Sequence, residues 1–363
     1  MKSNHSDSTF LQRYHLCFVV VLTMMFMFVM FMSIRQQGLG ALQESFFKKS
    51  FLIANFNRLR MKVGDRVFNN VLVGNDGWLQ YIGDHNLDDY QNAMNFSPTE
   101  LQATAATIQA CHEYAREHNM GFLIVVPPNK ATIYSDKMPE QIQPVSEIAR
   151  IDQLNNYLKK HNIPEVLDLR PSLREARQQQ DVFYKLGTHW NEYGAYIGYE
   201  TIINTLSQDY PELKPYSAEF LRFRLNPSKL VRRGDMDTAK ILQVNHLSLE
   251  PTLFFTRRLN KVYFQMDFSA PGKTPTYTRI SWIPDSNLPS LLMYHDSFGA
   301  VGLNSYLGLN FSNAVYIHRN SSSVLFNRRI IEQFSPDIVI FEIVERNLFW
   351  IRHQIAGCIK DSN

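Results

Sequence analysis

The sequence contains few cysteines and little excess charge, and each shortage excludes a class of protein. Three cysteines in 363 residues are too few for a disulfide scaffold or a four-cysteine zinc module. The 37 basic and 34 acidic side chains leave a formal charge of +3, which provides no basic stripe for nucleic-acid phosphates. With hydrophobic residues at 45% and only 16 Gly and 16 Pro, the chain is neither disordered nor collagen-like.

Sequence motifs for metals and nucleotides are missing as well. The chain has no GxxxxGK[ST] phosphate loop, and its 11 histidines are scattered along the sequence. We therefore expect neither a metal nor a cofactor. The length allows one large domain or two small ones. Cys17 lies in an apolar run, whereas Cys111 and Cys358 could either pair or stay free.

The longest apolar run predicts a membrane anchor. Residues 16–34 contain no charge, Pro or Gly, and about 19 helical residues rise roughly 28 Å, close to the hydrocarbon thickness of a bilayer. A cleaved signal peptide would have a shorter apolar core and a small-x-small cleavage site, which residues 38–41 match poorly. Polar flanks argue against a buried core helix. We predict an uncleaved anchor with residues 1–15 in the cytoplasm, although the basic residues on its two sides are nearly balanced.

After the anchor, the hydrophobic pattern predicts an α/β domain. Residues 35–69 are interpreted as a connector and residues 70–363 as one domain. Within this domain, residues 207–288 contain repeated prolines and short alternating stretches, which predicts an irregular, β-rich insertion. Continuous apolar runs are typical of strands buried on both faces of a parallel sheet, and helical segments lie between them. Such runs are 121–126, 291–294 and 314–317, and the segment 337–344, which is apolar except for Asp337 and Glu342, is also predicted to be a buried strand.

Ser297 is the candidate nucleophile. It lies in the run His295–Gly299, between an apolar strand and the start of a helix. Open α/β sheets place their sites at the carboxyl ends of strands, and free N–H groups at a helix start can stabilise an oxyanion. The alternative is an ordinary helix N-cap, a role that Ser and Asp commonly fill.

His189 is the candidate general base. It lies in the run Gly187–Asn191, which opens a helix, and a neutral imidazole there could accept the serine proton. The alternative is a packed histidine that is hydrogen-bonded to the backbone. Arg346 and Asn347 follow the last predicted strand and could donate into the same cleft, or they could belong to a surface ion pair.

These motifs resemble the alginate O-acetyltransferase-like branch of the SGNH hydrolase superfamily. The resemblance covers roughly residues 70–355 and depends mainly on the serine and histidine motifs. Four further segments support it: 73–79, 126–130, 234–236 and 344–347. It implies a three-layer SGNH-like α/β fold with a mostly parallel sheet, in which the histidine motif precedes the serine motif in a permuted order.

The resemblance also implies a function. Ser297 would form an acyl-enzyme with His189 as base, and acetyl groups would pass to hydroxyls of an exported polysaccharide. The donor would be a polytopic membrane O-acyltransferase, which places this domain on the periplasmic side of a bacterial inner membrane. The candidates for oxyanion or substrate contacts are Arg346, Asn347, Asn129 and Lys130. Trp78 and Trp190 are candidates for sugar stacking, with core packing as the alternative.

One position departs from the family pattern. The family usually has an Asp two residues before the catalytic His, and here that residue is Gly187. Loss of the orienting carboxylate in a triad can cost about 10⁴ in kcat. Candidates for a substitute acid are Asp181, Glu192 and Asp296, and a backbone carbonyl is a further alternative. Three functions stay open: a working O-acetyltransferase, a catalytically impaired polysaccharide-binding subunit and a carbohydrate acetylesterase.

Overall fold

The computed structural model of the chain divides into two units. It describes residues 19–28, 31–32, 35, 49–221, 224–226, 252–254, 263–267, 278–318 and 326–359. One unit comprises Met1–Asp65 with Leu242–Val244, and the other comprises Arg66–Ile241 with Asn245–Asn363. The second unit contains every predicted catalytic residue.

The described part of the first unit is helical. Residues 19–28 form a helix with exposed apolar side chains, and α3 spans Lys49–Lys62. Among the helices of the described ranges, none combines the length and the apolar character needed to cross a membrane. The predicted anchor and the tail before it fall partly outside those ranges, since residues 1–18, 29–30 and 33–34 are not described.

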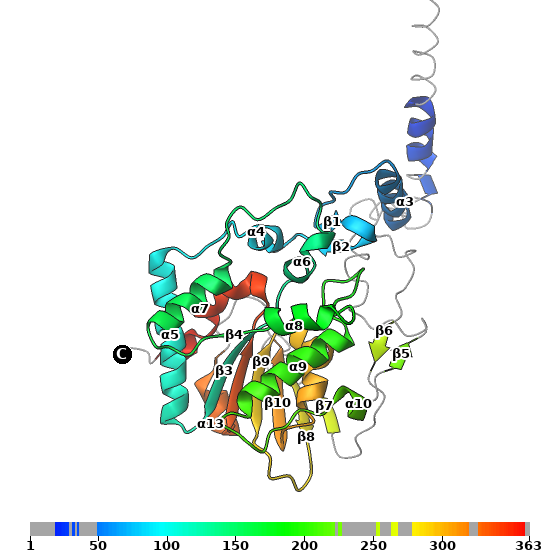
Figure 1. Cartoon of the computed structure of the whole chain (residues 1–363). Coiled ribbons are helices and arrows are strands. Elements are labelled where there is room, and N and C mark those ends of the chain that lie inside the picture. The colour runs from blue at the N-terminus through cyan, green and yellow to red at the C-terminus, as the bar shows by residue number, and fades with distance from the viewer. Residues whose placement is uncertain are drawn as a thin grey trace, which may run out of the picture. The chain divides into compact units, whose positions relative to one another are not determined.

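The second unit is built on a seven-stranded sheet in the order β4-β3-β11-β9-β10-β8-β7 (Figure 1). The strands are β3 (Gly121–Val126), β4 (Leu167–Asp168), β7 (Tyr263–Asp267), β8 (Thr278–Trp282), β9 (Leu291–His295), β10 (Asn313–His318) and β11 (Ile338–Glu342). The five strands from β4 to β10 pair in parallel, whereas β8 and β7 pair antiparallel at one edge. The mostly parallel sheet predicted from the continuous apolar runs is therefore confirmed.

Helices cover both faces of this sheet and make three layers. On one face lie α8 (Arg170–Arg177), α9 (Glu192–Leu206) and α12 (Asn304–Leu307); on the other lie α5 (Pro98–Glu117), α7 (Arg150–Lys160) and α13 (Arg328–Phe334) (Figure 1). Each face of the sheet has its own hydrophobic core, and successive residues of a strand point to opposite faces. In β9, Leu291 and Met293 pack in the core on the first face, and Leu292 and Tyr294 pack in the core on the second. This alternation explains why β9 is apolar at every position, because both of its faces are buried.

Short elements complete the unit. A hairpin of β1 (Val71–Val73) and β2 (Leu79–Tyr81) turns through Asp76 and Gly77, which both have positive φ angles. Two short strands, β5 (Arg224–Asn226) and β6 (Thr252–Phe254), pair within the predicted 207–288 insertion, while β7 and β8 of the same segment join the main sheet. Residues 222–223, 227–251, 255–262 and 268–277 of that insertion lie outside the described ranges.

A disulfide ties the start of the unit to its end. Cys111 on α5 bonds to Cys358 in the short helix η5 (Ala356–Cys358), at a sequence separation of 247 residues. Both cysteines are buried. Of the two states that the sequence left open for these residues, the structure contains the paired one.

Candidate active site

The turn that carries Ser297 is fixed by two carboxylates at the carboxyl ends of neighbouring strands. Glu342, the last residue of β11, accepts hydrogen bonds from the N–H groups of Asp296 (2.9 Å) and Gly299 (3.2 Å). In return, the carboxylate of Asp296 accepts from the N–H groups of Phe298 (2.8 Å) and Val344 (2.9 Å). These four bonds hold the serine turn against the end of the adjacent strand.

The same bonds single out the N–H group of Ser297. The amides of the residues on either side of it are occupied by the two carboxylates, and the amide of Ala300 donates to the carbonyl of Asp296. Within the described ranges, the Ser297 N–H meets no acceptor. A helix-start N–H beside a nucleophile is the donor that an oxyanion requires.

His295, two residues before the serine, has a structural role. It is buried, and its Nδ1 lies 2.7 Å from the carbonyl oxygen of Asp296, so Nδ1 carries the proton. Its Nε2 then accepts from the side-chain amide of Asn304 at 3.1 Å. Burial lowers the pKa of His295 to about 4, which keeps the ring neutral with both nitrogens bonded.

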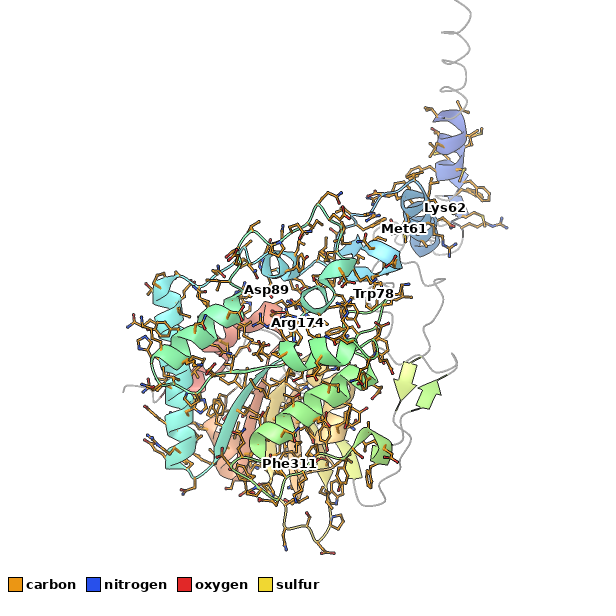
Figure 2. The ribbon with its side chains drawn as sticks, in the orientation of Figure 1. Met61, Lys62, Trp78, Asp89, Arg174 and Phe311 are labelled. Carbon is orange, nitrogen blue, oxygen red and sulfur yellow. A yellow bond between two sulfur atoms is a disulfide. The ribbon has the colours of Figure 1, made fainter. Side chains whose placement is uncertain are left out.

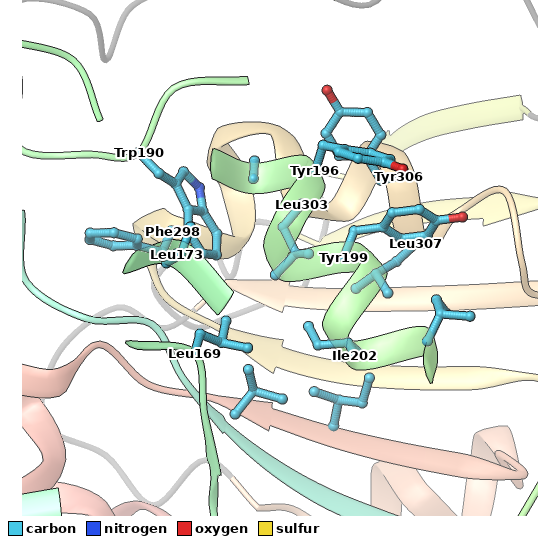
Figure 3. Close-up of a cluster of buried hydrophobic side chains, with 14 of the residues drawn as sticks. Leu169, Leu173, Trp190, Tyr196, Tyr199, Ile202, Phe298, Leu303, Tyr306 and Leu307 are labelled. Atoms are coloured by element: carbon cyan, nitrogen blue, oxygen red, sulfur yellow. The ribbon is translucent and has the colours of Figure 1, made fainter. Parts of the chain in front are cut away.

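The histidine motif reaches the serine turn through Phe298. Residues 183–190 form a tight loop, closed by pairing of Phe183 with Trp190. The rings of His189 and Trp190 each lie 5.2 Å from the ring of Phe298, the residue that follows Ser297. Figure 3 shows Trp190 beside Phe298. The indole N–H of Trp190 donates to the carbonyl of Val301 at 2.8 Å. The structure thus brings together two motifs that lie more than a hundred residues apart in the sequence.

Lys130 holds the loop that carries His189. Its ammonium group is buried and donates to the carbonyls of Tyr184 (3.2 Å), Lys185 (3.3 Å) and Gly187 (2.5 Å). It also lies 5.7 Å from the ring of Trp78. Because three donors are all that a lysine has, Lys130 supports the loop instead of binding an oxyanion or substrate, and that sequence prediction is wrong.

Asn129 positions Arg346. Asn129 is fully buried; its side chain donates to Asp89 (2.7 Å) and accepts from Nη1 of Arg346 (3.3 Å). The guanidinium carbon of Arg346 lies 5.8 Å from the Phe298 ring. Its Nε is buried without an acceptor in the described part of the chain. Arg346 therefore reaches the serine end of the site, while Asn347 is partly exposed and its N–H bonds to the Val344 carbonyl.

Each of the three candidate orienting acids accepts a hydrogen bond within the described ranges. Asp181 accepts from the hydroxyl of Tyr134 (3.1 Å), and Glu192 accepts from the hydroxyl of Tyr306 (3.0 Å). Asp296 is used by the serine turn, as described above. Nδ1 of His189 lies 3.2 Å from the hydroxyl of Thr188, a contact that the sequence did not predict.

Neither tryptophan predicted to stack on a sugar presents a ring face to solvent. Trp190 is fully buried, and Trp78 is 5% exposed and stacks on Tyr134 with ring centroids 4.2 Å apart. The stacking prediction is therefore wrong, and both rings belong to the hydrophobic core. Figure 2 shows Trp78 and Asp89 beyond one end of the strands and Phe311 at the opposite end.

Two buried acidic side chains, Glu345 and Asp89, lie close to Arg346. Glu345 accepts from the N–H of Asn129 (2.9 Å) and the hydroxyl of Thr132 (2.7 Å), and burial followed by the charge of Asp89 raises the pKa of Glu345 to about 7. Burial also raises the pKa of Asp89, which Arg150 approaches to 3.4 Å. Over the described ranges, no group of His, Cys, Asp and Glu is arranged to hold a metal ion.

Comparison with protein families gives one match. A family model described as "SGNH hydrolase-like domain, acetyltransferase AlgX" matches residues 71–263, just over half of the chain. The match includes the histidine motif and confirms the family prediction made from the motifs. It ends before Ser297. No curated protein matches the chain significantly.

Solved structures resemble the fold at low sequence identity. PatB1 of Bacillus cereus is 18% identical with a TM-score of 0.55, over 77% of this chain and 96% of that one; it is also known with a sulfonyl adduct. The O-acetyltransferase domain of Pseudomonas putida AlgJ is 17% identical with a TM-score of 0.50, covering 79% and 99%. A DHHW family protein from Eubacterium siraeum is 12% identical with a TM-score of 0.55, covering 80% and 96%. At these identities the likeness shows the shared fold alone.

Proposed function

The chain belongs to the family of SGNH hydrolase-like acetyltransferase domains represented by AlgX, and on this basis we propose that it is an O-acetyltransferase acting on a polysaccharide. Ser297 is the nucleophile and His189 is the general base. The observation that carries this proposal is the serine turn: the amides around Ser297 are bonded, and its own N–H is left for an oxyanion.

The chemistry proceeds in two acyl transfers. His189 takes the proton of Ser297 as Oγ bonds to the carbonyl carbon of an acetyl donor, and the oxyanion accepts from the Ser297 N–H with Arg346 nearby. The bond to the donor breaks, and the donor's leaving atom takes the proton from His189. A sugar hydroxyl then gives its proton to His189 and bonds to the acetyl carbon. The ester to Ser297 breaks, and Oγ recovers the proton.

The proposal includes a membrane location. The apolar segment 16–34 anchors the chain, the domain lies in the periplasm, and a polytopic membrane O-acyltransferase delivers acetyl groups to it. Anchoring raises the effective concentration of the two partners without new contacts. The Cys111–Cys358 disulfide supports this location, because disulfides persist in oxidising compartments.

One observation favours a second candidate, a catalytically impaired polysaccharide-binding subunit. Gly187 stands where the family has an Asp, so the loop offers only its backbone carbonyl, which bonds to Lys130. In that case Ser297 would be intact but poorly activated, and glycan binding would be the remaining function.

Reaction with a sulfonyl fluoride and hydrolysis of a small acetyl ester test the proposal. In the full-length protein in detergent, we expect phenylmethylsulfonyl fluoride to label Ser297 and the ester to turn over. Ser297→Ala and His189→Ala should each lower turnover by about 10³-fold or more, and an added oligosaccharide should become acetylated. Ser207→Ala and His161→Ala, at two helix ends, serve as controls. Turnover that survives both active-site variants would overturn the proposal, and glycan binding without any turnover would favour the second candidate.

A further inference from the structure

A hollow of about 460 Å³ lies outside the catalytic residues described so far. It is lined by residues 94–96, the first part of α5, the start of α7, the 3₁₀-helix η4 (Glu345–Trp350) and the helix α14 (Ile351–Gln354) that follows it. The lining side chains that matter here are Glu100, Arg150, Phe349, Trp350, Arg352 and His353. Its volume falls within the range of small-molecule sites.

Trp350 provides an exposed aromatic platform in this hollow. It is 49% exposed, in contrast to the buried Trp78 and Trp190. Its ring lies 4.8 Å from the ring of Phe349 and 5.8 Å from that of His353, so the platform is supported from two sides. A large apolar ring beside polar side chains is the combination that binds a sugar, because one face of a pyranose is apolar and its edge is polar.

Arg150 provides hydrogen-bond donors in the same hollow. The side chain is 2% exposed, and its guanidinium carbon lies 5.2 Å from the Phe349 ring. Nε donates to the carbonyl of Met94 at 2.6 Å, and Nη2 faces Asp89 at 3.4 Å. Nη1 is buried, and among the described residues it has no hydrogen-bond acceptor. A buried donor of this kind costs free energy until an acceptor reaches it.

Helix η4 connects the hollow to the catalytic end of the sheet. It begins with Glu345 and Arg346, separated from the end of β11 by two residues, and ends at Trp350. In a 3₁₀-helix, residues three apart lie on the same side, about 6 Å from each other along the axis. Asn347 and Trp350 therefore share one side of η4, and Arg346 reaches Phe298 beside the nucleophile. Helix η4 therefore contributes Trp350 to the hollow and Arg346 to the end of the sheet that carries Ser297.

We propose that this hollow is an acceptor subsite that binds one hexopyranose unit of the polysaccharide. The sugar ring stacks on Trp350, and oxygen atoms on its edge accept hydrogen bonds from Arg150 and Arg352. Those oxygens can be hydroxyls of a neutral sugar or the carboxylate of a uronic acid. That the bound sugar is the acetyl acceptor rests on the proposed function. That the hollow binds a sugar does not, because binding requires no turnover.

Glycan binding by the full-length Ser297→Ala protein tests the subsite without turnover. The probes are cellohexaose for a neutral glycan and a galacturonic acid hexamer for an acidic one, each titrated by calorimetry. We expect Trp350→Ala to weaken binding of the recognised glycan about tenfold or more, and Trp350→Phe to retain most of it. Arg352→Ala should weaken the acidic probe more than the neutral one if a carboxylate is the acceptor.

A second measurement separates this inference from the proposed function. In the protein with Ser297 intact, Trp350→Ala should raise the KM for the oligosaccharide about tenfold and leave hydrolysis of a small acetyl ester within about twofold. If Ser297→Ala abolishes ester turnover but Trp350→Ala leaves glycan affinity unchanged, the subsite is refuted and the proposed function stands. If wild-type protein shows Trp350-dependent binding without turnover, the subsite stands and the proposed function fails. Binding of neither probe to wild-type protein also refutes the subsite.

Discussion

The carboxylate of Glu342 accepts a hydrogen bond from the N–H of Asp296 at 2.9 Å, which joins the end of β11 to the residue before the candidate nucleophile. The same oxygen accepts from Gly299 on the other side of the serine. Gly299 is required there, since a Cβ at this position would lie 2.5 Å from the Cβ of His295. The close approach and the shared carboxylate together fix the direction in which Ser297 leaves the strand.

Removing the Glu342 carboxylate should therefore loosen the serine turn. We expect Glu342→Ala to lower the free energy of unfolding by about 1–3 kcal/mol, because two buried N–H groups lose their acceptor. Glu342→Gln keeps an acceptor oxygen and should lose less stability while ester turnover falls about tenfold. Urea unfolding and ester hydrolysis measure the two effects, with Glu332→Gln, an exposed residue of α13, as the control. Unchanged turnover in Glu342→Ala would mean that the turn is held by other contacts.

The strands and several helix ends could be predicted because their signals are local. The run 121–126 is apolar throughout and forms β3 over the same residues. Ser97 and Glu100 have the Ser-x-x-Glu spacing of a capping box, and both of its reciprocal bonds are present at the start of α5. The strand predicted at 337–344 is shorter in the structure, since β11 ends at Glu342. Beyond it, the N–H of Val344 donates to the carboxylate of Asp296 and the N–H of Glu345 donates to the carbonyl of Pro127.

The supports of the site could not be predicted, because they join residues that are distant in the sequence. Lys130 reaches a carbonyl 57 residues away, and Asn129 meets Arg346 across 217 residues. Burial of the tryptophans is also a tertiary property. From the sequence, Trp78 and Trp190 are the candidates for sugar stacking and Trp350 is missed, and only the packing shows that Trp350 is exposed whereas the other two are buried.

Lys130→Met should impair catalysis through the His189 loop. The substitution keeps much of the side-chain volume but removes the donor from the carbonyls of Tyr184, Lys185 and Gly187. The Lys185 carbonyl also accepts from the N–H of Leu79, but the Gly187 carbonyl is buried and loses the ammonium donor. Loss of such a buried hydrogen bond costs about 1–3 kcal/mol, so the loop should shift and ester turnover should fall about tenfold or more. Lys159→Met, at an exposed position of α7, should leave turnover unchanged. Normal turnover in Lys130→Met would show that the loop keeps its position without the ammonium group.

The Cys111–Cys358 disulfide should contribute strongly to stability. It closes a loop over a sequence separation of 247 residues, and removal of a native disulfide typically costs about 2–5 kcal/mol. We expect the double variant Cys111→Ser, Cys358→Ser to unfold at lower urea concentration than the oxidised protein. The control is wild-type protein under a reductant, which should match the double variant. Equal unfolding midpoints for the oxidised protein and the double variant would contradict a stabilising role.

Glu345 should make the stability of the domain depend on pH. Burial and the neighbouring Asp89 raise the pKa of Glu345 from an ordinary value of 4.5 to about 7. A carboxyl group with a raised pKa holds its proton more tightly in the folded protein, so its contribution is fully present below pH 4.5 and is lost as the pH rises through about 7. The change corresponds to about 3 kcal/mol. Glu345→Gln should remove this loss, since the amide oxygen can still accept from Asn129 and Thr132. Urea unfolding at pH 5 and pH 8 checks this: the free energy of unfolding of the variant, relative to that of wild type, should be higher at pH 8 than at pH 5. The same difference between variant and wild type at both pH values would show that Glu345 titrates near its ordinary pKa.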